Sequence, residues 1–440
     1  MRSSKGLWSS GIATAAALAL ATLVLSSVPA HAQVQPGDFI TPDNATKVKD
    51  LVSPGEYARI MHGMSLKIVP TERIDWPPPY KEATEKYSAQ VRLSPDGRSL
   101  VGFVAGEPFP ILDSNDPHAA DKIMWNVAFR PISSDDYDLR WFDCPSAYWG
   151  HNTSYREIND YEVGHYAGYN LVGRTEVDPV PIDPDFKITN RYFLSLLYPV
   201  LAPQSDRGAG FIRYRYASAQ RDDDMWSYTP GARRVRRINY AIMDSATGPQ
   251  AYDPNHYEGF SGKNEFYDFR FMGEKSMLSA INVGHSPDVQ CPTDGGASHC
   301  PDPWQVRHTF LIQARPRPGH FNSLYEHEIL YIDSEADFVM AGDTYDRSGQ
   351  LFNNYVSWTY YADRSQPDAK IAIYPFKRLF QVGSSTLNVQ SGFSTVCYHP
   401  SPHAPSADSW FINMGAVDRS WFTTEALQAA AEGGHAHSGD

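Results

Sequence analysis

From Tyr161 onward the chain is a succession of short segments in which apolar and polar residues alternate, separated by turn signals. In residues 211–216, for example, one apolar and two aromatic side chains share one face of a strand and two arginines share the other. Pro230-Gly231 separates two further segments of this kind and indicates a hairpin. No βαβ rhythm and no internal repeat are present, which argues against a doubly wound sheet and a propeller. We therefore predict an α+β, mostly β fold: a long antiparallel sheet that must curl, with a few covering helices.

The composition supports this prediction and excludes one class of partner. Aromatic residues make up 13% of the 440 residues, and these side chains favour strands. Hydrophobic residues make up 42%, which is enough to bury a large core. The formal net charge of −13 argues against a nucleic-acid binder, which needs a basic face.

The first 32 residues have the form of a signal peptide. Arg2 and Lys5 precede an apolar run over residues 12–28, and Ala30-His31-Ala32 has the small-x-small form of a cleavage site. A membrane anchor is the alternative, but threonines and serines interrupt the run. We therefore expect export to the periplasm and cleavage near Ala32.

The four cysteines suit an oxidising compartment. Cys291 and Cys300 flank a loop rich in Gly, Pro and Asp, and we predict a disulfide between them. By default, Cys144 and Cys397 form the second bridge. The alternative is a zinc site that includes Cys291, His299 and Cys300, although the spacing lacks a C-x-x-C pair.

Four segments of the chain are predicted. After the signal peptide (1–32), residues 33–80 form an N-terminal arm, and Trp76-Pro77-Pro78-Pro79-Tyr80 is a polyproline strap within it. A docking motif is the alternative interpretation of the prolines. Residues 81–424 form a single β-rich domain, although a split into two remains open at this size. Residues 425–440 form a mobile polar tail.

Several runs of unusual composition resemble a bacterial family known as domain of unknown function family 1329. These runs are Ser53-Pro54-Gly55-Glu56-Tyr57, His62-Gly63-Met64, Pro70-Thr71-Glu72-Arg73-Ile74 and the stretch 76–88. The resemblance covers roughly residues 39–422.

A second resemblance lies inside the first. Residues 222–230 and 233–238 are similar to the signature of outer-membrane lipoprotein-sorting (LolA-like) proteins. This resemblance implies an unclosed barrel with helices at its mouth that carries lipid acyl chains across the periplasm. It also implies work alongside an RND-type exporter and an outer-membrane protein. The chain departs from the pattern in being about twice as long as a simple carrier, so its insertions could fill the cavity.

Two groups of residues are candidates for ligand binding. Arginines on one predicted strand could hold an anionic headgroup, because guanidinium groups bind phosphate or carboxylate in bidentate fashion: Arg233, Arg234, Arg236 and Arg237. The alternative is a solvated strand that pairs with the acidic run 222–224 across the hairpin. The second group is the apolar and aromatic residues on alternating strand faces, which are candidates for a concave, ligand-binding lining: Ile212, Tyr214, Tyr216, Val306, Phe310, Ile312, Phe352, Val356, Trp358 and Tyr360. The alternative is that these residues are plain core packing.

We find no arrangement that predicts catalysis, a metal or a cofactor. In Tyr325-Glu326-His327-Glu328 the two carboxylates share one strand face and the histidine points to the other, so no general base is assembled. Two pairs of histidines are weak candidates for binding a metal. One pair, at 399 and 403, lies in a loop near Cys397, and the other, at 435 and 437, lies in the predicted tail. No nucleophile elbow, phosphate loop or dinucleotide fingerprint is present.

The sequence therefore favours a periplasmic carrier or binder of a lipid or other hydrophobic molecule that acts without chemistry. One alternative is a periplasmic enzyme acting on an envelope polymer or hydrophobic substrate. Another is a non-catalytic assembly protein. The aromatic strand faces either line a cavity or fill it, and this difference decides between them.

Overall fold

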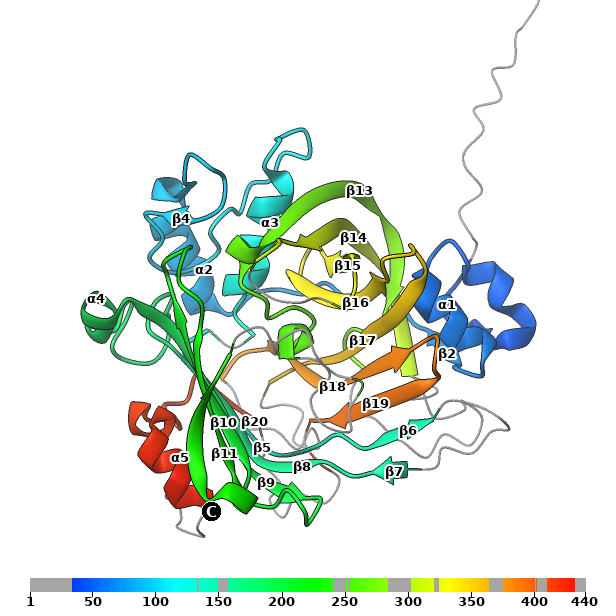
Figure 1. Cartoon of the computed structure of the whole chain (residues 1–440). Helices are drawn as coiled ribbons and strands as arrows, with labels where there is room; N and C mark the ends of the chain where they lie inside the picture. The colour runs from blue at the N-terminus through cyan, green and yellow to red at the C-terminus, as the bar shows by residue number, and fades with distance from the viewer. Residues whose placement is uncertain are drawn as a thin grey trace, which may run out of the picture.

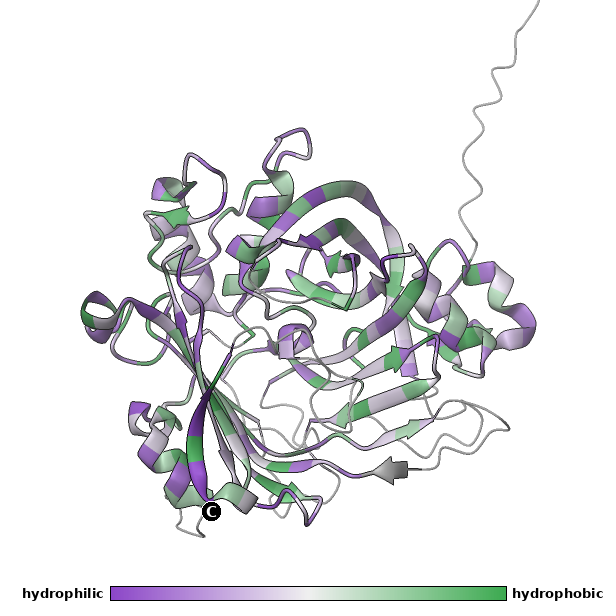
Figure 2. Ribbon diagram, viewed as in Figure 1, coloured by the Kyte–Doolittle hydropathy of each residue, from purple (hydrophilic) through white to green (hydrophobic). Residues whose placement is uncertain are grey.

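One curved sheet of eighteen strands dominates the part of the chain that the structure describes. The structure is a computed structural model, and it describes residues 34–132, 134–148, 157–239, 251, 254–283, 302–319, 324–363, 375–399, 401 and 410–431. Apolar and polar residues alternate along many of its strands (Figure 2).

The first half of the sheet is an antiparallel meander. Its strands pair in the order β5 (Asp136–Asp143), β8 (Glu162–Asn170), β9 (Arg191–Ala202), β10 (Gly210–Tyr216), β11 (Asp224–Thr229) and β12 (Arg234–Ile238). Strand β10 is the segment whose alternation was clearest in the sequence, and the predicted hairpin at Pro230-Gly231 joins β11 to β12.

The second half is another antiparallel meander, which returns to the first. Its strands are β13 (Tyr267–Ser279), β14 (Asp302–Pro316), β15 (His327–Asp333), β16 (Phe338–Tyr345), β17 (Leu351–Ala362), β18 (Arg378–Asn388) and β19 (Phe393–Tyr398). Strand β19 pairs with β5 and with β6 (Ser146–Tyr148). The short strands β7 (Glu157–Asn159) and β20 (Trp410–Ile412) pair with β6 and β5.

The two meanders leave the barrel open between β12 and β13, as Figure 1 shows. Among the described residues, β12 pairs only with β11 and β13 pairs only with β14. The prediction of a curved, mostly antiparallel sheet that does not close is confirmed. Helix α3 (Ala119–Phe129) lies at this opening, where Met124 and Val127 belong to an apolar cluster that includes residues of both edges. These are Met225 and Ile238 on one side and Phe269 and Phe271 on the other.

The predicted N-terminal arm is a packed part of the fold. Strands β1 (Phe39–Ile40) and β2 (Leu66–Ile68) pair with each other, and β2 also runs parallel to β14. Between them lie the 3-10 helix η1 (Pro42–Val48) and helix α1 (Pro54–Met61). Helix α1 begins at Ser53, which forms a capping box with Glu56, and it packs on β16 and β17 from outside the barrel (Figure 1).

The predicted polyproline strap is wrong. Pro78 and Pro79 occupy the first turn of helix α2 (Pro78–Tyr87), and Tyr80 is buried. The first turn tolerates proline because its N–H groups have no partner inside the helix and the proline φ angle is already helical. After α2 come the 3-10 helix η2 (Ser88–Gln90) and a hairpin of β3 (Arg92–Leu93) and β4 (Leu100–Val101).

The predicted polar tail begins inside a helix. Helix α5 (Thr424–Ala431) covers the outer face of β9–β11, and its own Leu427 is buried against the strands. The 3-10 helix η8 (Arg419–Phe422) precedes it, and the short helix α4 (Asp185–Thr189) lies before β9. The rest of the predicted tail lies outside the described residues, as does the predicted signal peptide.

Part of the chain between β12 and β13 lies in the lumen, by which we mean the space on the concave side of the sheet (Figure 1). Residues 254–266, which we call the lumen segment, include the 3-10 helices η5 (Pro254–His256) and η6 (Asn264–Phe266). Nε2 of His256 lies 2.6 Å from Oε2 of the buried Glu328 on β15. At the other end, Arg215 donates to the carbonyl of Ser261 at 2.9 Å. The lumen segment therefore crosses the barrel from the second meander to the first.

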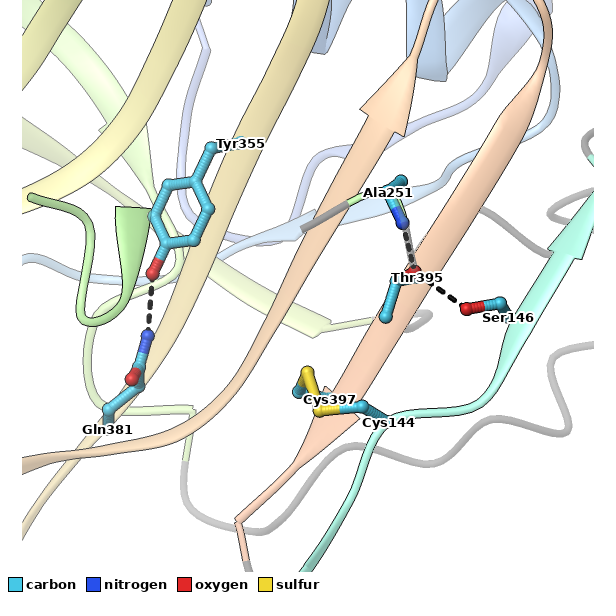
Figure 3. The surroundings of a disulfide bond; sticks show 7 residues. All are labelled: Cys144, Ser146, Ala251, Tyr355, Gln381, Thr395 and Cys397. Carbon is cyan, nitrogen blue, oxygen red and sulfur yellow. Dashed lines mark hydrogen bonds between the residues drawn. A yellow bond between two sulfur atoms is a disulfide. The ribbon is translucent and has the colours of Figure 1, made fainter. Parts of the chain in front are cut away.

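A disulfide joins the two meanders. Cys144, just after β5, bonds to Cys397 on β19, which confirms this predicted pair. Figure 3 shows its surroundings: the hydroxyl of Thr395 lies 2.7 Å from that of Ser146 and accepts a hydrogen bond from the backbone of Ala251 at 2.8 Å. Cys291 and Cys300 lie outside the described residues, so their predicted bridge remains a prediction.

Candidate functional site

Two cavities among the described residues of the lumen are small. One cavity beside the disulfide measures about 20 Å³, and another beneath helix α3 measures about 80 Å³. Pockets that hold organic ligands usually measure about 300–1,000 Å³. The lumen segment and the strand side chains fill the space that an acyl chain would need.

The residues predicted as a concave lining pack against protein. Ile212, Tyr214 and Tyr216 lie in the cluster covered by helix α5, outside the lumen. Val356, Trp358 and Tyr360 belong to the cluster that includes the N-terminal residues, and Val306 packs at its border. Phe310 and Ile312 belong to the cluster beneath helix α3, and Phe352 is half-buried. A ligand-binding role for these residues remains a prediction.

The arginines predicted as a headgroup site lie at the sheet edge. Arg233, Arg234 and Arg236 are exposed. The carboxylate of Asp224, on the neighbouring strand, accepts a hydrogen bond from Arg237 and another from Arg221 at 3.0 Å. This cross-strand pair is the arrangement that the alternative interpretation of a solvated strand describes.

Two other arginines point into the lumen, because they alternate with the side chains beneath helix α5. Arg213 and Arg215 on β10 are both buried. Nε of Arg215 donates to Asp223 at 3.0 Å, and Nε of Arg213 lies 4.0 Å from the same carboxylate. Arg213 also donates to the hydroxyl of Ser195 at 3.3 Å. The sequence placed these arginines on one face correctly but did not show that this face is the inner one.

A third buried arginine completes the lining of the 80 Å³ cavity, which we call the arginine cavity. Arg130, after helix α3, donates to Oε2 of Glu258 in the lumen segment at 3.2 Å. The remaining side chains around the cavity are mainly aromatic or amide groups: Tyr137, Tyr166, Asn170, Tyr192, Phe193, Phe260 and Asn264.

A larger, apolar pocket lies next to the arginine cavity, outside the lumen. This aromatic pocket has a volume of about 250 Å³ between the β3–β4 hairpin, helix α3 and strand β9. The ring centroid of Phe129 lies 4.1 Å from that of Phe103 and 6.0 Å from those of Trp125 and Tyr192. The other lining residues include Leu100, Val172, Phe186 and Glu265. Trp125 and Phe129 stand four residues apart in helix α3, a spacing that puts both rings on one face of a helix and is a sequence signal that could have found the pocket.

One carboxyl group belongs to the wall of the aromatic pocket. Glu265 is buried, and this burial raises the pKa of its carboxyl group. The nearby Lys263 opposes the shift, and burial lowers the pKa of Lys263 itself. Lys263 is held by the carbonyl oxygens of Ser218 and Arg221 at 2.5 and 2.6 Å. The wall of the pocket therefore combines one buried carboxyl group with half-buried rings.

The two glutamates that flank His327 have different partners. Glu328 contacts His256, whereas Glu326 pairs with Arg315 at 3.2 Å and also lies 3.6 Å from Nδ1 of His327. The ring of His327 stacks on that of Tyr345 with centroids 5.0 Å apart. No group of three His, Cys, Asp or Glu side chains suited to a metal ion occurs in the part of the chain that the structure describes.

The match to a sequence family covers most of the chain. The model of DUF1329, a protein family of unknown function, matches residues 39–428. The chain belongs to the DUF1329 family. This confirms the family resemblance carried by the segments near residues 53 and 76. No curated protein matches the chain in sequence.

Solved structures similar to this DUF1329 protein include three from bacteria. A Vibrio parahaemolyticus domain described as an outer membrane lipoprotein-sorting protein is 14% identical, with 70% of this chain and 97% of that chain covered and a TM-score of 0.46. A DUF1329 family protein from Desulfovibrio piger is 15% identical, with 71% and 100% covered and a TM-score of 0.45. A LolA superfamily protein from Nitrosomonas europaea is 10% identical, with 69% and 97% covered and a TM-score of 0.38. Among the described residues of this chain, no helix is both long and apolar enough to span a membrane.

Proposed function

We propose that this DUF1329 protein binds and carries a hydrophobic molecule in the periplasm. The aromatic pocket holds this molecule, and no chemical reaction takes place there. The signal-peptide pattern of residues 1–32 and the Cys144–Cys397 disulfide support an exported protein, because disulfides persist in oxidising compartments. The predicted partnership with an RND-type exporter and an outer-membrane protein is part of this proposal and rests on family resemblance.

The gathering of half-buried rings around one pocket is the observation that carries the proposal. Phe103, Phe129, Phe186 and Tyr192 are all half-buried around one apolar pocket. An apolar pocket with one convergent polar group is the usual form of a small-molecule site. Covering such rings releases apolar surface from water at about 25 cal/mol per Å².

The pocket volume sets the size of the ligand. At about 250 Å³, the aromatic pocket is at the lower end for organic ligands, so it fits a ring system or a short alkyl chain. A complete lipid would leave most of its chains outside. The proposal therefore differs from the carrier that the resemblance implied, in which the lumen holds acyl chains.

Binding of a neutral hydrophobic probe tests the proposal. N-phenyl-1-naphthylamine should bind the purified mature protein at one saturable site and fluoresce. Phe129→Ala should weaken binding by about tenfold, because it removes the ring that contacts three others. Phe39→Ala, which removes a half-exposed ring on β1, is the matched control and should bind as the wild type does.

An independent result comes from purifying the protein from the periplasm, extracting any bound molecule with organic solvent and identifying it by mass spectrometry. A co-purifying hydrophobic molecule that Phe129→Ala loses would support the proposal. An empty protein without saturable probe binding would contradict it. In that case the assembly role becomes the better candidate, because the filled lumen is what a non-carrier scaffold would show.

A further inference from the structure

Another pocket lies between the first turns of helix α3 and the strands β13 and β14. It measures about 350 Å³, which is within the range of pockets that hold organic ligands. Ala119 and Ile123 of α3, Phe271 of β13 and Phe310 of β14 form its apolar wall. The loop 107–114 and the turn between β15 and β16 complete the lining, and none of the described residues lines both this pocket and the aromatic pocket.

Carboxyl groups determine the charge of this pocket, which we call the carboxylate pocket. Of the described residues that line it, four are acidic and none is a lysine or an arginine. Asp113 and Glu274 are exposed, and Glu274 lies 3.2 Å from Nε2 of His308. The other ring nitrogen of His308 lies 3.0 Å from the hydroxyl of Ser334. The remaining two acidic residues, at positions 107 and 337, are less exposed than these.

Glu107 and Asp337 have oxygen atoms that can still accept hydrogen bonds. Nδ2 of Asn126 donates to Oε1 of Glu107 at 2.9 Å, and no described residue donates to its Oε2. Asp337 is only 3% exposed, yet no described residue donates a hydrogen bond to its carboxyl group. Because buried polar groups in proteins normally have partners, a buried carboxyl group without a donor in the wall of a pocket favours a ligand that donates to it.

The charges near Asp337 do not replace this donor. Arg130 attracts Asp337 but donates to Glu258 at 3.2 Å, and Glu107 and Asp333 repel Asp337. Burial, together with Glu107, raises the pKa of Asp337 well above its ordinary value, and burial raises the pKa of Glu107 to about 7. The two carboxyl groups of the empty pocket therefore retain protons, and a bound cation can take the place of a proton as the compensating charge.

We infer that the carboxylate pocket binds a small organic cation: its ammonium group lies at Glu107 and Asp337, and its apolar body lies against Phe271 and Phe310. A metal ion suits the pocket less well, because the described part of the chain contains no group of three side chains that could hold one. The apolar wall also favours an organic molecule over a hydrated ion. This inference goes beyond the proposed function, because it concerns a different pocket and a charged ligand.

Three ligands that share a phenyl ring and differ in their polar group test the inference on the mature protein: phenethylamine, 2-phenylethanol and phenylacetate. Isothermal titration calorimetry should show phenethylamine binding at one site about tenfold or more tightly than the other two, because charge-assisted hydrogen bonds are stronger than neutral ones. A salt concentration of about 150 mM screens general attraction to an acidic protein. Equal affinity for phenethylamine and 2-phenylethanol, or tighter binding of phenylacetate, would overturn the inference.

The naphthylamine probe separates this inference from the proposed function. Saturating phenethylamine should leave the probe bound, because the two pockets have different lining residues. Displacement of the probe would place the amine in the aromatic pocket and overturn the inference, with the proposed function intact. Binding of phenethylamine to a protein that does not bind the probe would support the inference and contradict the proposed function.

Two substitutions that remove charge but keep shape assign the binding to the carboxylate pocket. Asp337 has a φ of 45°, which asparagine also accepts, and glutamine at position 107 keeps an acceptor for Asn126. Asp337→Asn and Glu107→Gln should each weaken phenethylamine binding by about tenfold. The matched control is Asp50→Asn, which removes an exposed carboxylate outside the pocket and should keep the wild-type affinity.

The variants can also overturn the inference. An equal loss of affinity in Asp50→Asn would show that the amine responds only to the overall charge of the protein. Wild-type affinity in both Asp337→Asn and Glu107→Gln would show that the amine binds elsewhere. If Asp337→Asn does not fold, Glu107→Gln and the ligand series decide.

Discussion

The backbone N–H of Gly55, in the first turn of helix α1, donates a hydrogen bond to the carboxylate of Asp343 on strand β16 at 3.2 Å. Asp343 also accepts a hydrogen bond from the hydroxyl of Ser53 at 3.1 Å. A Cβ atom at Gly55 would overlap the side chains of both Asp343 and Asn354. Helix α1 can therefore lie this close to the sheet only because residue 55 has no side chain.

Replacement of Gly55 by alanine should destabilise the fold. Either the helix or the strand must shift, and overpacking of this kind costs about 1–3 kcal/mol. Urea unfolding of Gly55→Ala measures the cost. Gly231→Ala is the matched control, because a Cβ atom there meets open space, and its free energy of unfolding should stay within about 0.5 kcal/mol of the wild type. Equal stability of the two variants would contradict this account of the contact.

The buried carboxyl group of Glu56 should make stability fall as the pH rises. Burial raises its pKa to about 8 from an ordinary value of 4.5, and burial also raises the pKa of Asp343 to about 6. The folded state therefore binds these protons more tightly than the unfolded state does. The stabilisation by Glu56 is complete below pH 4.5 and is lost as the pH rises through about 8.

Glu56→Gln tests this pH dependence. Glutamine retains an acceptor for the backbone N–H of Ser53 but cannot ionise, so the free energy of unfolding should fall less steeply between about pH 5 and pH 9 than in the wild type. Urea unfolding at several pH values measures the slopes. Glu85→Gln, on an exposed part of α2, serves as the control and should keep the wild-type slope. A wild-type slope in Glu56→Gln would show that Glu56 does not titrate in this range.

Removal of the Cys144–Cys397 disulfide should cost about 2–5 kcal/mol of stability, because the bridge closes a long loop and constrains the unfolded chain. The two residues are 253 positions apart, and both are buried. Chemical unfolding of the Cys144→Ala, Cys397→Ala double variant measures the loss. Unchanged stability would mean that strand pairing alone holds the two meanders together.

The lumen segment should loosen when its aromatic anchor is removed. Phe260 is buried, and its ring centroid lies 5.0 Å from that of Tyr267 and 5.9 Å from that of Phe269. Phe260→Ala should cost about 3–5 kcal/mol and increase amide hydrogen exchange across residues 254–266. Phe39→Ala should change neither quantity appreciably. Unaltered exchange in Phe260→Ala would show that polar contacts alone fix the segment.

Local periodicity predicted the strands well but could not assign their faces. The alternation in residues 211–216 placed two arginines opposite one aliphatic and two aromatic residues, as β10 does. Which side is concave depends on what covers each face, and helix α5, within a segment predicted as a tail, covers the aromatic one. Strand β5 was missed for a related reason. It is buried on both faces, and Asp138 within it pairs with His165 at 3.0 Å, so no alternation is visible.

The candidate site was less predictable than the fold, because long-range contacts assemble it. The aromatic pocket combines Phe103, Phe129 and Tyr192 from three separate elements, and the arginine cavity also needs Glu258 of the lumen segment. No sequence pattern indicated that the chain between two strands would cross the barrel.

The return of β19 to β5 and β6 determines when the sheet can be completed during synthesis. Strand β5 acquires β8 soon after it emerges, but its other edge waits for residues more than two hundred positions later. Such contact order slows folding, and an unpaired strand edge invites pairing with other chains. The protein therefore carries an open edge on β5 until β19 and β20 have been made, so a chain that stops before β19 lacks both strands that cover this edge.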